Sequence, residues 1–477
     1  MEFITIQDYH TKLLNGQTSC IEAVRFYLQQ IQSSSHLNAW LEIFEEEALE
    51  KARELDSQLN KSNSLLPLHG VVVGIKDVIC YKNHTVSAAS KILENFTSIY
   101  NSTVVERLLE AGAIIIGRQN CDEFAMGSSN ENSAYGFVKN GIDEERVPGG
   151  SSGGSAVAVQ TNTCMISLGS DTGGSVRQPA DFCGIIGFKP SYGTISRHGL
   201  IAYASSFDQI GIFANSISDV TKVLHIIAGA DEFDSTMNQE IVLINKVKEN
   251  KNKKTKLAYF KQALEHPGLD SNIKEQFFSF ISSLTNLGFE IEPIDFELFN
   301  YIVPTYYILT TAEASTNLSR YDGVKYGYKT ICNVDDLTDF YKKTRTKGFG
   351  KEVKRRILLG TFVLSAGYYD TYFSKAQQVR NKLIDKTKNI FTQFDGIIMP
   401  TVPSPAFKIG EGQTNPVEIF LADIYTVYAN LTGIPAISIP LFKHKCGLPF
   451  GLQLMTERND DLTLLRLSEE LLNFKKD

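Results

Sequence analysis

Apolar residues recur at helical spacing in the first part of the chain and in short continuous runs farther on. Helical spacing is clear at residues 20–31, and residues 44–59 follow with charge on one face. Apolar runs at 68–76 and 113–117 then predict buried strands, separated by a helix that Ser102 can cap. Because helices alternate with apolar strands, we expect an α/β sheet.

The same alternation continues to the end of the chain. Further strands are predicted at 256–260, 289–293, 396–401, 434–440 and 449–454, and further helices at 219–229, 273–287 and 462–472. We expect one α/β domain over residues 1–477, with a large mixed, mostly parallel β-sheet flanked by helices. Within it we expect a helical N-terminal arm at 1–65, a core at 66–230 and a helical insertion at 300–390.

Composition and charge narrow the class of protein. The 477 residues are 43% apolar and 21% charged, values typical of globular proteins and unlike those of disordered or fibrous chains. The net charge of −7 argues against a general phosphate-binding surface. It does not exclude RNA binding through a partner protein or a local basic patch.

Cysteine usage and the N-terminus indicate the compartment. The seven cysteines include no C-x-x-C pair, which argues against a zinc ribbon or a disulfide framework and favours a reducing compartment. The N-terminus has neither a basic nor an apolar leader region, and no apolar run is long enough to span a bilayer. We therefore expect a soluble, cytoplasmic protein that does not bind membranes.

Several familiar motifs are present in the wrong context. Residues 149–153 match G-x-S-x-G, but they lack the preceding apolar strand that a nucleophile elbow requires. Residues 73–76 resemble the kinase V-A-I-K motif without H-R-D or D-F-G after them. The eight histidines form no H-x-H or H-E-x-x-H pair, so no metal site is expected, whereas a Ser-His-Asp triad of distant members stays open.

Three segments without histidine hold the remaining candidate chemistry. Lys76 ends an apolar strand, residues 148–155 read PGGSSGGS, and residues 169–179 read GSDTGGSVRQP. Ser151 lies 75 residues after Lys76, and Ser175 follows 24 residues later. Tight turns explain either glycine run alone, but they do not explain the three segments together.

This combination resembles the amidase signature family, in which the same three segments occur in the same order. The resemblance implies that the chain has the amidase signature fold, with Ser175 as nucleophile, Ser151 as a bridging serine held by a cis peptide and Lys76 as base. It also assigns the oxyanion hole to Thr172, Gly173 and Gly174. Asp171 and Arg177 flank this stretch and are expected to brace the loop or to act directly.

The residue types fit the hydrolysis of an amide. A serine hydroxyl is a weak nucleophile that needs a base, and a lysine is a base only when it is neutral. The pKa of Lys76 must fall by about 3 units from its ordinary value, which corresponds to about 4 kcal/mol of disfavoured charge. We expect burial at the strand end to cause that shift, and Ser151 to relay the proton from Ser175.

Flanking segments point to one branch of the family. Residues 122–129, 314–323, 348–360 and 365–370 resemble the A subunits of glutamyl-tRNA(Gln) amidotransferases, and the likeness extends from about residue 5 to 472. It implies that the chain hydrolyses glutamine and passes ammonia to a B subunit, which amidates Glu-tRNA(Gln) with ATP and Mg²⁺, while a small C subunit wraps both. It implies no cofactor in this chain.

The resemblance also implies a pocket for the charged groups of glutamine. Its matching residues are Asp423 for the ammonium group, Arg355 or Arg356 for the carboxylate, Tyr306 or Tyr307, Gly127 and Ser128. Of each pair we prefer Arg355 and Tyr306.

Two other functions stay open. A stand-alone amidase acting on a small carboxamide would share the catalytic residues, and an apolar pocket lining would favour it over a glutaminase. A scaffold that kept the fold without activity is the other alternative, and the intact Lys76, Ser151 and Ser175 argue against it.

Overall fold

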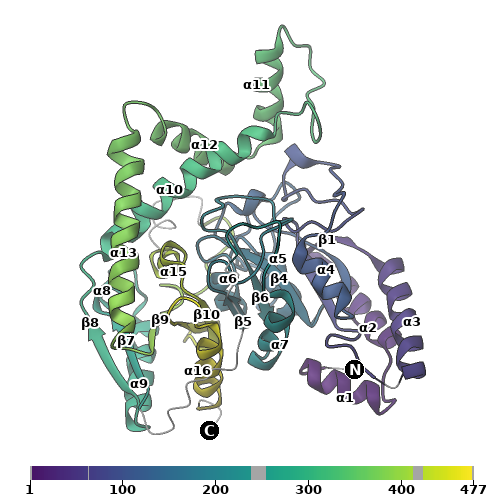
Figure 1. Cartoon of the computed structure of the whole chain (residues 1–477), viewed down its shortest axis with the longest axis horizontal. Coiled ribbons are helices and arrows are strands. Elements are labelled where there is room, and N and C mark those ends of the chain that lie inside the picture. The colour runs from purple at the N-terminus through teal and green to yellow at the C-terminus, as the bar shows by residue number, and fades with distance from the viewer. Residues whose placement is uncertain (1–2, 63, 238–253, 412–422, 475–477) are drawn as a thin grey trace.

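A computed structural model of the chain describes residues 3–62, 64–237, 254–411 and 423–474 (Figure 1). Its centre is an eleven-stranded sheet with the strand order β1-β3-β2-β4-β6-β5-β10-β11-β9-β7-β8. The strands are β1 Trp40–Ile43, β2 Val72–Lys76, β3 Ile114–Gln119, β4 Ile166–Asp171, β5 Ile186–Lys189, β6 Gln209–Ala214, β7 Lys256–Phe260, β8 Glu290–Ile294, β9 Gly396–Pro400, β10 Ala436–Lys443 and β11 Pro449–Met455.

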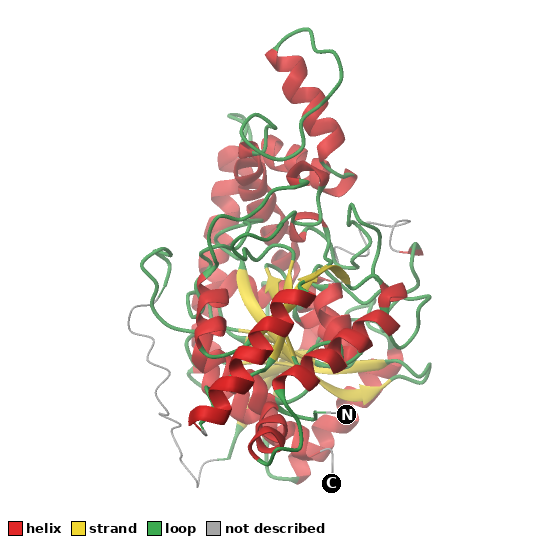
Figure 2. Cartoon of the chain, turned by 90° about the vertical axis from the view of Figure 1, so that its right-hand side faces the viewer, coloured by secondary structure: helices red, strands yellow, loops and turns green. Residues whose placement is uncertain are grey.

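Helices lie in front of and behind the sheet (Figure 2). They are α1 Ile6–Leu14, α2 Cys20–Ser33, α3 Glu45–Ser62, α4 Thr103–Glu110, α5 Gly153–Gln160, α6 Arg177–Cys183, α7 Ile217–Ile227, α8 Lys261–Glu265, α9 Ser271–Asn286, α10 Ile302–Asn317, α11 Leu337–Gly348, α12 Lys351–Val363, α13 Lys375–Phe391, α15 Val427–Thr432 and α16 Asp461–Phe474. Among the described helices, none is long and apolar enough to cross a membrane.

Central strands are buried on both faces, which explains their continuous apolar runs. Every residue of β2, β3, β4, β5 and β6 is buried, because α5 and α6 pack against these strands and α7 packs against β6. The edge strand β8 is only half-buried and contains Pro293, a residue that edge strands tolerate because its missing N–H faces away from a partner.

The prediction of a mixed sheet between helices is confirmed, but the expected predominance of parallel pairs is wrong. Six of the ten neighbouring strand pairs are antiparallel. The connection from β5 to β6 contains no helix, and a tight turn joins β10 to β11. Such connections cannot form the crossover that parallel neighbours need, so the middle of the sheet is antiparallel.

The N-terminal arm is helical in α1, α2 and α3, as the periodicity predicts. It also contains β1, which the sequence pattern did not reveal and which pairs antiparallel with β3 at one edge of the sheet. The strand is four residues long and half-buried throughout, so it shows no apolar run.

The insertion at 300–390 is helical, as expected, and comprises α10, α11, α12 and α13. α10 packs against α12, α13 and α15, and Figure 1 shows α11 at the far end of this unit, away from the sheet. The insertion thereby brings Tyr306 of α10 and Arg356 of α12 close to the segments that follow β3 and β4.

Candidate active site

Lys76 is the last residue of β2, and its side chain is fully buried. Its Nζ lies 2.6 Å from Ser151 Oγ, 2.9 Å from Ser152 Oγ and 2.9 Å from Ser170 Oγ. Among the described residues, no carboxylate forms an ion pair with Lys76. Burial lowers the pKa of Lys76 to about 8, although nearby thiol and carboxyl groups oppose this shift.

The three contacts of Lys76 suit both charge states of its amine. Ser152 Oγ donates to the Ser170 carbonyl at 3.1 Å, so it accepts from Lys76. A second N–H can point to Ser170 Oγ, which leaves the nitrogen lone pair for the Ser151 hydroxyl. A charged amine donates its three N–H groups to Ser151, Ser152 and Ser170, whereas a neutral amine donates two and its lone pair can accept the Ser151 proton.

Ser151 is held by the loop that enters α5. A cis peptide joins it to Gly150, its side chain is fully buried, and its carbonyl accepts from the Asp122 N–H at 3.0 Å. The next amide, Ser152 N–H, donates to the Ser175 carbonyl at 3.2 Å. A backbone hydrogen bond therefore joins the two glycine-rich segments, residues 148–155 and 169–179, directly beside Ser151.

Ser175 lines a small cavity together with residues from five other segments of the chain. The lining residues are Ala125, Gly127, Ser128, Gly150, Gly173, Gly174, Ser175, Gln178, Tyr306, Arg356, Asp423 and Thr426. The lining thus combines four hydroxyl-bearing residues, four glycines, one acid and one base.

Gly173 and Gly174 let the backbone approach the cavity closely. A Cβ on Gly173 would lie 2.3 Å from the Tyr306 hydroxyl, and Gly174 has a φ of +122°. The Gly174 N–H already donates to Asp171 Oδ1 at 2.8 Å. Gly173 and Gly174 are among the cavity-lining residues and Thr172, whose hydroxyl donates to Asp208 at 2.6 Å, is not.

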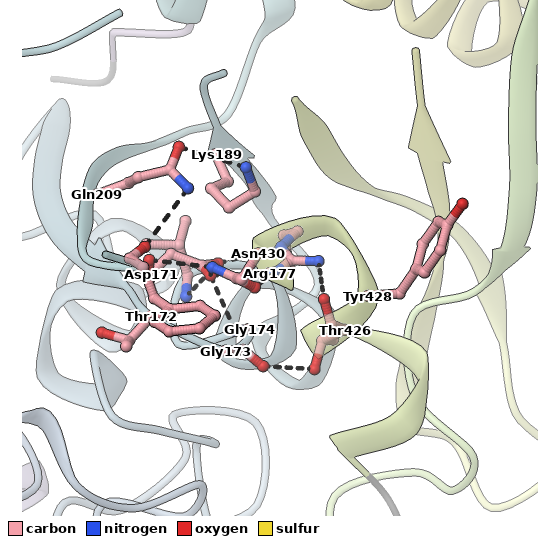
Figure 3. A network of polar contacts seen from close by, with 12 residues as sticks. Asp171, Thr172, Gly173, Gly174, Arg177, Lys189, Gln209, Thr426, Tyr428 and Asn430 are labelled. Carbon is pink, nitrogen blue, oxygen red and sulfur yellow. Dashed lines mark hydrogen bonds and ion pairs between the residues drawn. The ribbon is translucent and has the colours of Figure 1, made fainter. Parts of the chain in front are cut away.

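A buried ion pair braces this loop (Figure 3). Arg177 and Asp171 are both fully buried, and Arg177 Nη2 lies 2.9 Å from Asp171 Oδ1. Although burial acts to raise it, the guanidinium holds the pKa of Asp171 well below its usual range. Arg177 also donates to the Thr426 carbonyl and to Asn430, which makes the bracing role of the pair plain.

The cavity is lined by Arg356 and not by Arg355, the arginine that the sequence analysis preferred. The Arg356 side chain is 6% exposed and that of Arg355 is 39% exposed. Both pair with Glu352, and Arg356 Nη1 also donates to the Tyr203 hydroxyl at 2.6 Å. Successive residues of a helix point about 100° apart, so only one of them can face the cavity.

Asp423 lines the cavity from the segment that precedes α15. It accepts hydrogen bonds from the Tyr307 hydroxyl at 2.6 Å and from Ser128 Oγ at 3.2 Å. Burial raises the pKa of Asp423 to about 6, although the hydrogen bonds from Tyr307 and Ser128 oppose this shift. Tyr306 is one of the cavity-lining residues, whereas Tyr307 contacts the cavity only through its hydrogen bond to Asp423.

Sequence reasoning missed several residues around this centre. They are Ser152 and Ser170 beside Lys76, and Ala125, Gly150, Gln178 and Thr426 in the cavity lining. Ser152 and Ser170 stand next to Ser151 and Asp171 in the glycine-rich segments, which was the available signal. Thr426 Oγ1 donates to the Gly173 carbonyl at 2.7 Å across 253 residues, a contact that no local pattern predicts.

The chain matches a protein family over most of its length. The family model described as amidase matches residues 22–465. The resemblance carried by Lys76 and the two glycine-rich segments is therefore confirmed at the level of the family.

Individual relatives agree with this match. The A subunit of glutamyl-tRNA(Gln) amidotransferase from Chlorobium phaeobacteroides (strain BS1) is 45% identical over 477 residues, with 99% of each chain covered. The A subunit of the same enzyme from Chlorobaculum tepidum is 46% identical, and the match covers 99% of this chain and 98% of that one. The crystal structure of the glutamyl-tRNA(Gln) amidotransferase A subunit from Thermotoga maritima has a TM-score of 0.78 and 38% identity, covering 97% of this chain and 93% of that one.

Proposed function

This chain belongs to the amidase family, and from that premise we propose that it is the glutamine-hydrolysing A subunit of a glutamyl-tRNA(Gln) amidotransferase. The observation that carries the choice of substrate is the pair of opposite charges in the cavity. Arg356 and Asp423 both line the space that Ser175 faces. Free glutamine carries a carboxylate and an ammonium group, which such a pair can bind while its side-chain amide reaches Ser175.

In the proposed reaction, Ser175 Oγ attacks the side-chain amide carbon of glutamine. The Ser175 proton passes to Ser151, whose own proton passes to the neutral Lys76 amine, 2.6 Å away. Collapse of the tetrahedral intermediate breaks the C–N bond, and the proton returns by the same route to the leaving nitrogen. Ammonia leaves, and water then hydrolyses the ester by the same steps to give glutamate and free Ser175.

The Gly173 N–H of the glycine loop would stabilise the oxyanion, whereas the Gly174 N–H is bound to Asp171. The close approach of Gly173 to the cavity supports this role, because no side chain separates its backbone from a bound carbonyl. Arg177 and Thr426 hold the loop in this position, and preorganised donors need no rearrangement as charge develops.

The proposal includes partners. Ammonia would pass to a B subunit that uses ATP and Mg²⁺ to amidate Glu-tRNA(Gln), with a C subunit completing a cytoplasmic heterotrimer. Exposed apolar side chains on and after α12, among them Leu358, Phe362 and Tyr368, offer surface for such contacts. An acid and a base in the lining favour glutamine, whereas an apolar lining would have favoured a stand-alone carboxamide amidase.

Replacing the proposed nucleophile tests the function. In the purified amidotransferase complex, Ser175→Ala should lower ammonia release from glutamine by at least about a thousandfold. Added ammonium chloride should still support amidation of Glu-tRNA(Gln), because the partner's chemistry is untouched. Ser218→Ala, at an exposed position of α7, is the matched control. An unchanged glutaminase rate in Ser175→Ala would refute the assignment.

The pH dependence tests the base. Because Lys76 accepts a proton only when neutral, and burial lowers its pKa to about 8, the reactive fraction grows as pH rises toward that value. Glutaminase kcat/KM should increase about tenfold per pH unit below the pKa and level off above it. Lys76→Arg, which keeps the charge, should be inactive throughout. A flat profile from about pH 6.5 to 9 contradicts the role of Lys76.

The two neighbouring arginines provide a matched pair for substrate binding. Arg356→Met should raise the KM for glutamine about ten- to hundredfold, the loss expected for a charged hydrogen bond to carboxylate. Arg355→Met removes the other partner of Glu352 and should leave KM nearly unchanged. Steady-state kinetics of glutamine hydrolysis measure both. Equal effects of the two changes would show that Arg356 does not bind the substrate.

A further inference from the structure

Glu123 is a buried carboxylate that takes no part in the proposed hydrolysis. It is 3% exposed and lies in the short 3₁₀ turn Glu123–Ala125, just before the cavity-lining residues Ala125, Gly127 and Ser128. Its two oxygens accept from the Gly350 N–H at 2.8 and 3.1 Å. This contact joins segments that are 227 residues apart.

The contact lies at the start of α12, the helix that carries Arg356. The first N–H groups of a helix lack partners within the helix, and negative charge there is favourable. The residue at the cap position is Gly350, which has no side chain to supply an acceptor, and Glu123 supplies one from outside. A Cβ on Gly350 would lie 2.3 Å from Glu123 Oε2, so the helix start is shaped around this carboxylate.

The other side of Glu123 is tied to the strand that ends in Lys76. Ser90 Oγ donates a short hydrogen bond to Glu123 Oε1. The loop that carries Ser90 is fixed by Asp77, which follows Lys76 and accepts from the backbone N–H groups of Ser87 and Ala89 at 2.9 and 2.7 Å. Through these hydrogen bonds, Glu123 connects the loop that follows Lys76 to α12, the helix that carries Arg356.

Aromatic packing supports the same junction. The Phe124 ring lies 5.8 Å from that of Phe349 and 5.1 Å from that of Tyr321. Phe124 and Ala125 have φ values of 51° and 58°, which turn the chain from the Glu123 contact toward the cavity. Glu123 and its neighbours therefore join the start of α12 to the cavity loop.

We propose that Glu123 is a positioning residue for glutamine binding: its bond to the start of α12 sets the place of Arg356 in the cavity. The inference rests on the proposed function, since it names what determines affinity for the substrate of that site. It assigns Glu123 no contact with substrate. Weakening the bond should therefore change binding much more than the chemical step.

Glu123→Gln is the sharpest test, because it keeps the shape and replaces one acceptor oxygen by an NH₂ group that repels the Gly350 N–H. In the complex, KM for glutamine should rise about three- to tenfold with kcat within about twofold. Ser90→Ala should give a smaller rise in the same direction. Glu94→Gln, an exposed carboxylate of the neighbouring loop, is the matched control and should match the wild type.

Binding of L-glutamine separates this inference from the proposed function. Calorimetry is performed on the complex with Ser175→Ala, which cannot turn over, with and without Glu123→Gln. Weaker glutamine binding by the Ser175→Ala, Glu123→Gln complex than by the Ser175→Ala complex supports the inference. Equal affinity in the two proteins, or a loss of kcat with unchanged KM, overturns it alone. If the Ser175→Ala complex binds no glutamine, the proposed function and this inference both fail.

Discussion

Burial of one amine is the constraint on which the site depends. Lys76 ends a strand that is buried on every residue, and three hydroxyl groups meet its nitrogen. In water a lysine is almost always charged near neutral pH, and a charged amine cannot accept a proton. The cost of burying charge makes the neutral form accessible here, and in that form the nitrogen lone pair can accept the Ser151 proton.

Nearby carboxylates would undo this arrangement if they paired with Lys76, and the fold gives them other partners. Asp171 is bound by the Arg177 guanidinium, and Asp77 by Arg118 at 2.6 Å. The same bonds shape the cavity, because Arg177 reaches the segment of Thr426 and Asp77 fixes the loop before Glu123. The contacts that keep Asp171 and Asp77 from pairing with Lys76 are therefore also contacts that position the cavity-lining segments.

Much of this could be predicted from the sequence, because the informative residues lie in short runs. Apolar strands, the Ser102-capped helix and the glycine-rich segments are local, and the structure shows them where the pattern indicates, with Ser102 Oγ accepting from Val105 N–H. Strand direction was not predictable in the same way, since it depends on which strands pair after distant segments meet. Which of Arg355 and Arg356 lines the cavity was not predictable for a related reason, because packing sets the helix face that meets the cavity.

The ionisation of Lys76 tests the central claim most directly. In protein labelled with ¹³C and ¹⁵N at lysine, the side-chain resonance that disappears in Lys76→Arg can be followed against pH. The account predicts a midpoint near about 8, with a neutral amine above it. A midpoint at or above about 10, the value of a lysine in water, would mean that burial does not neutralise this amine and would contradict the account.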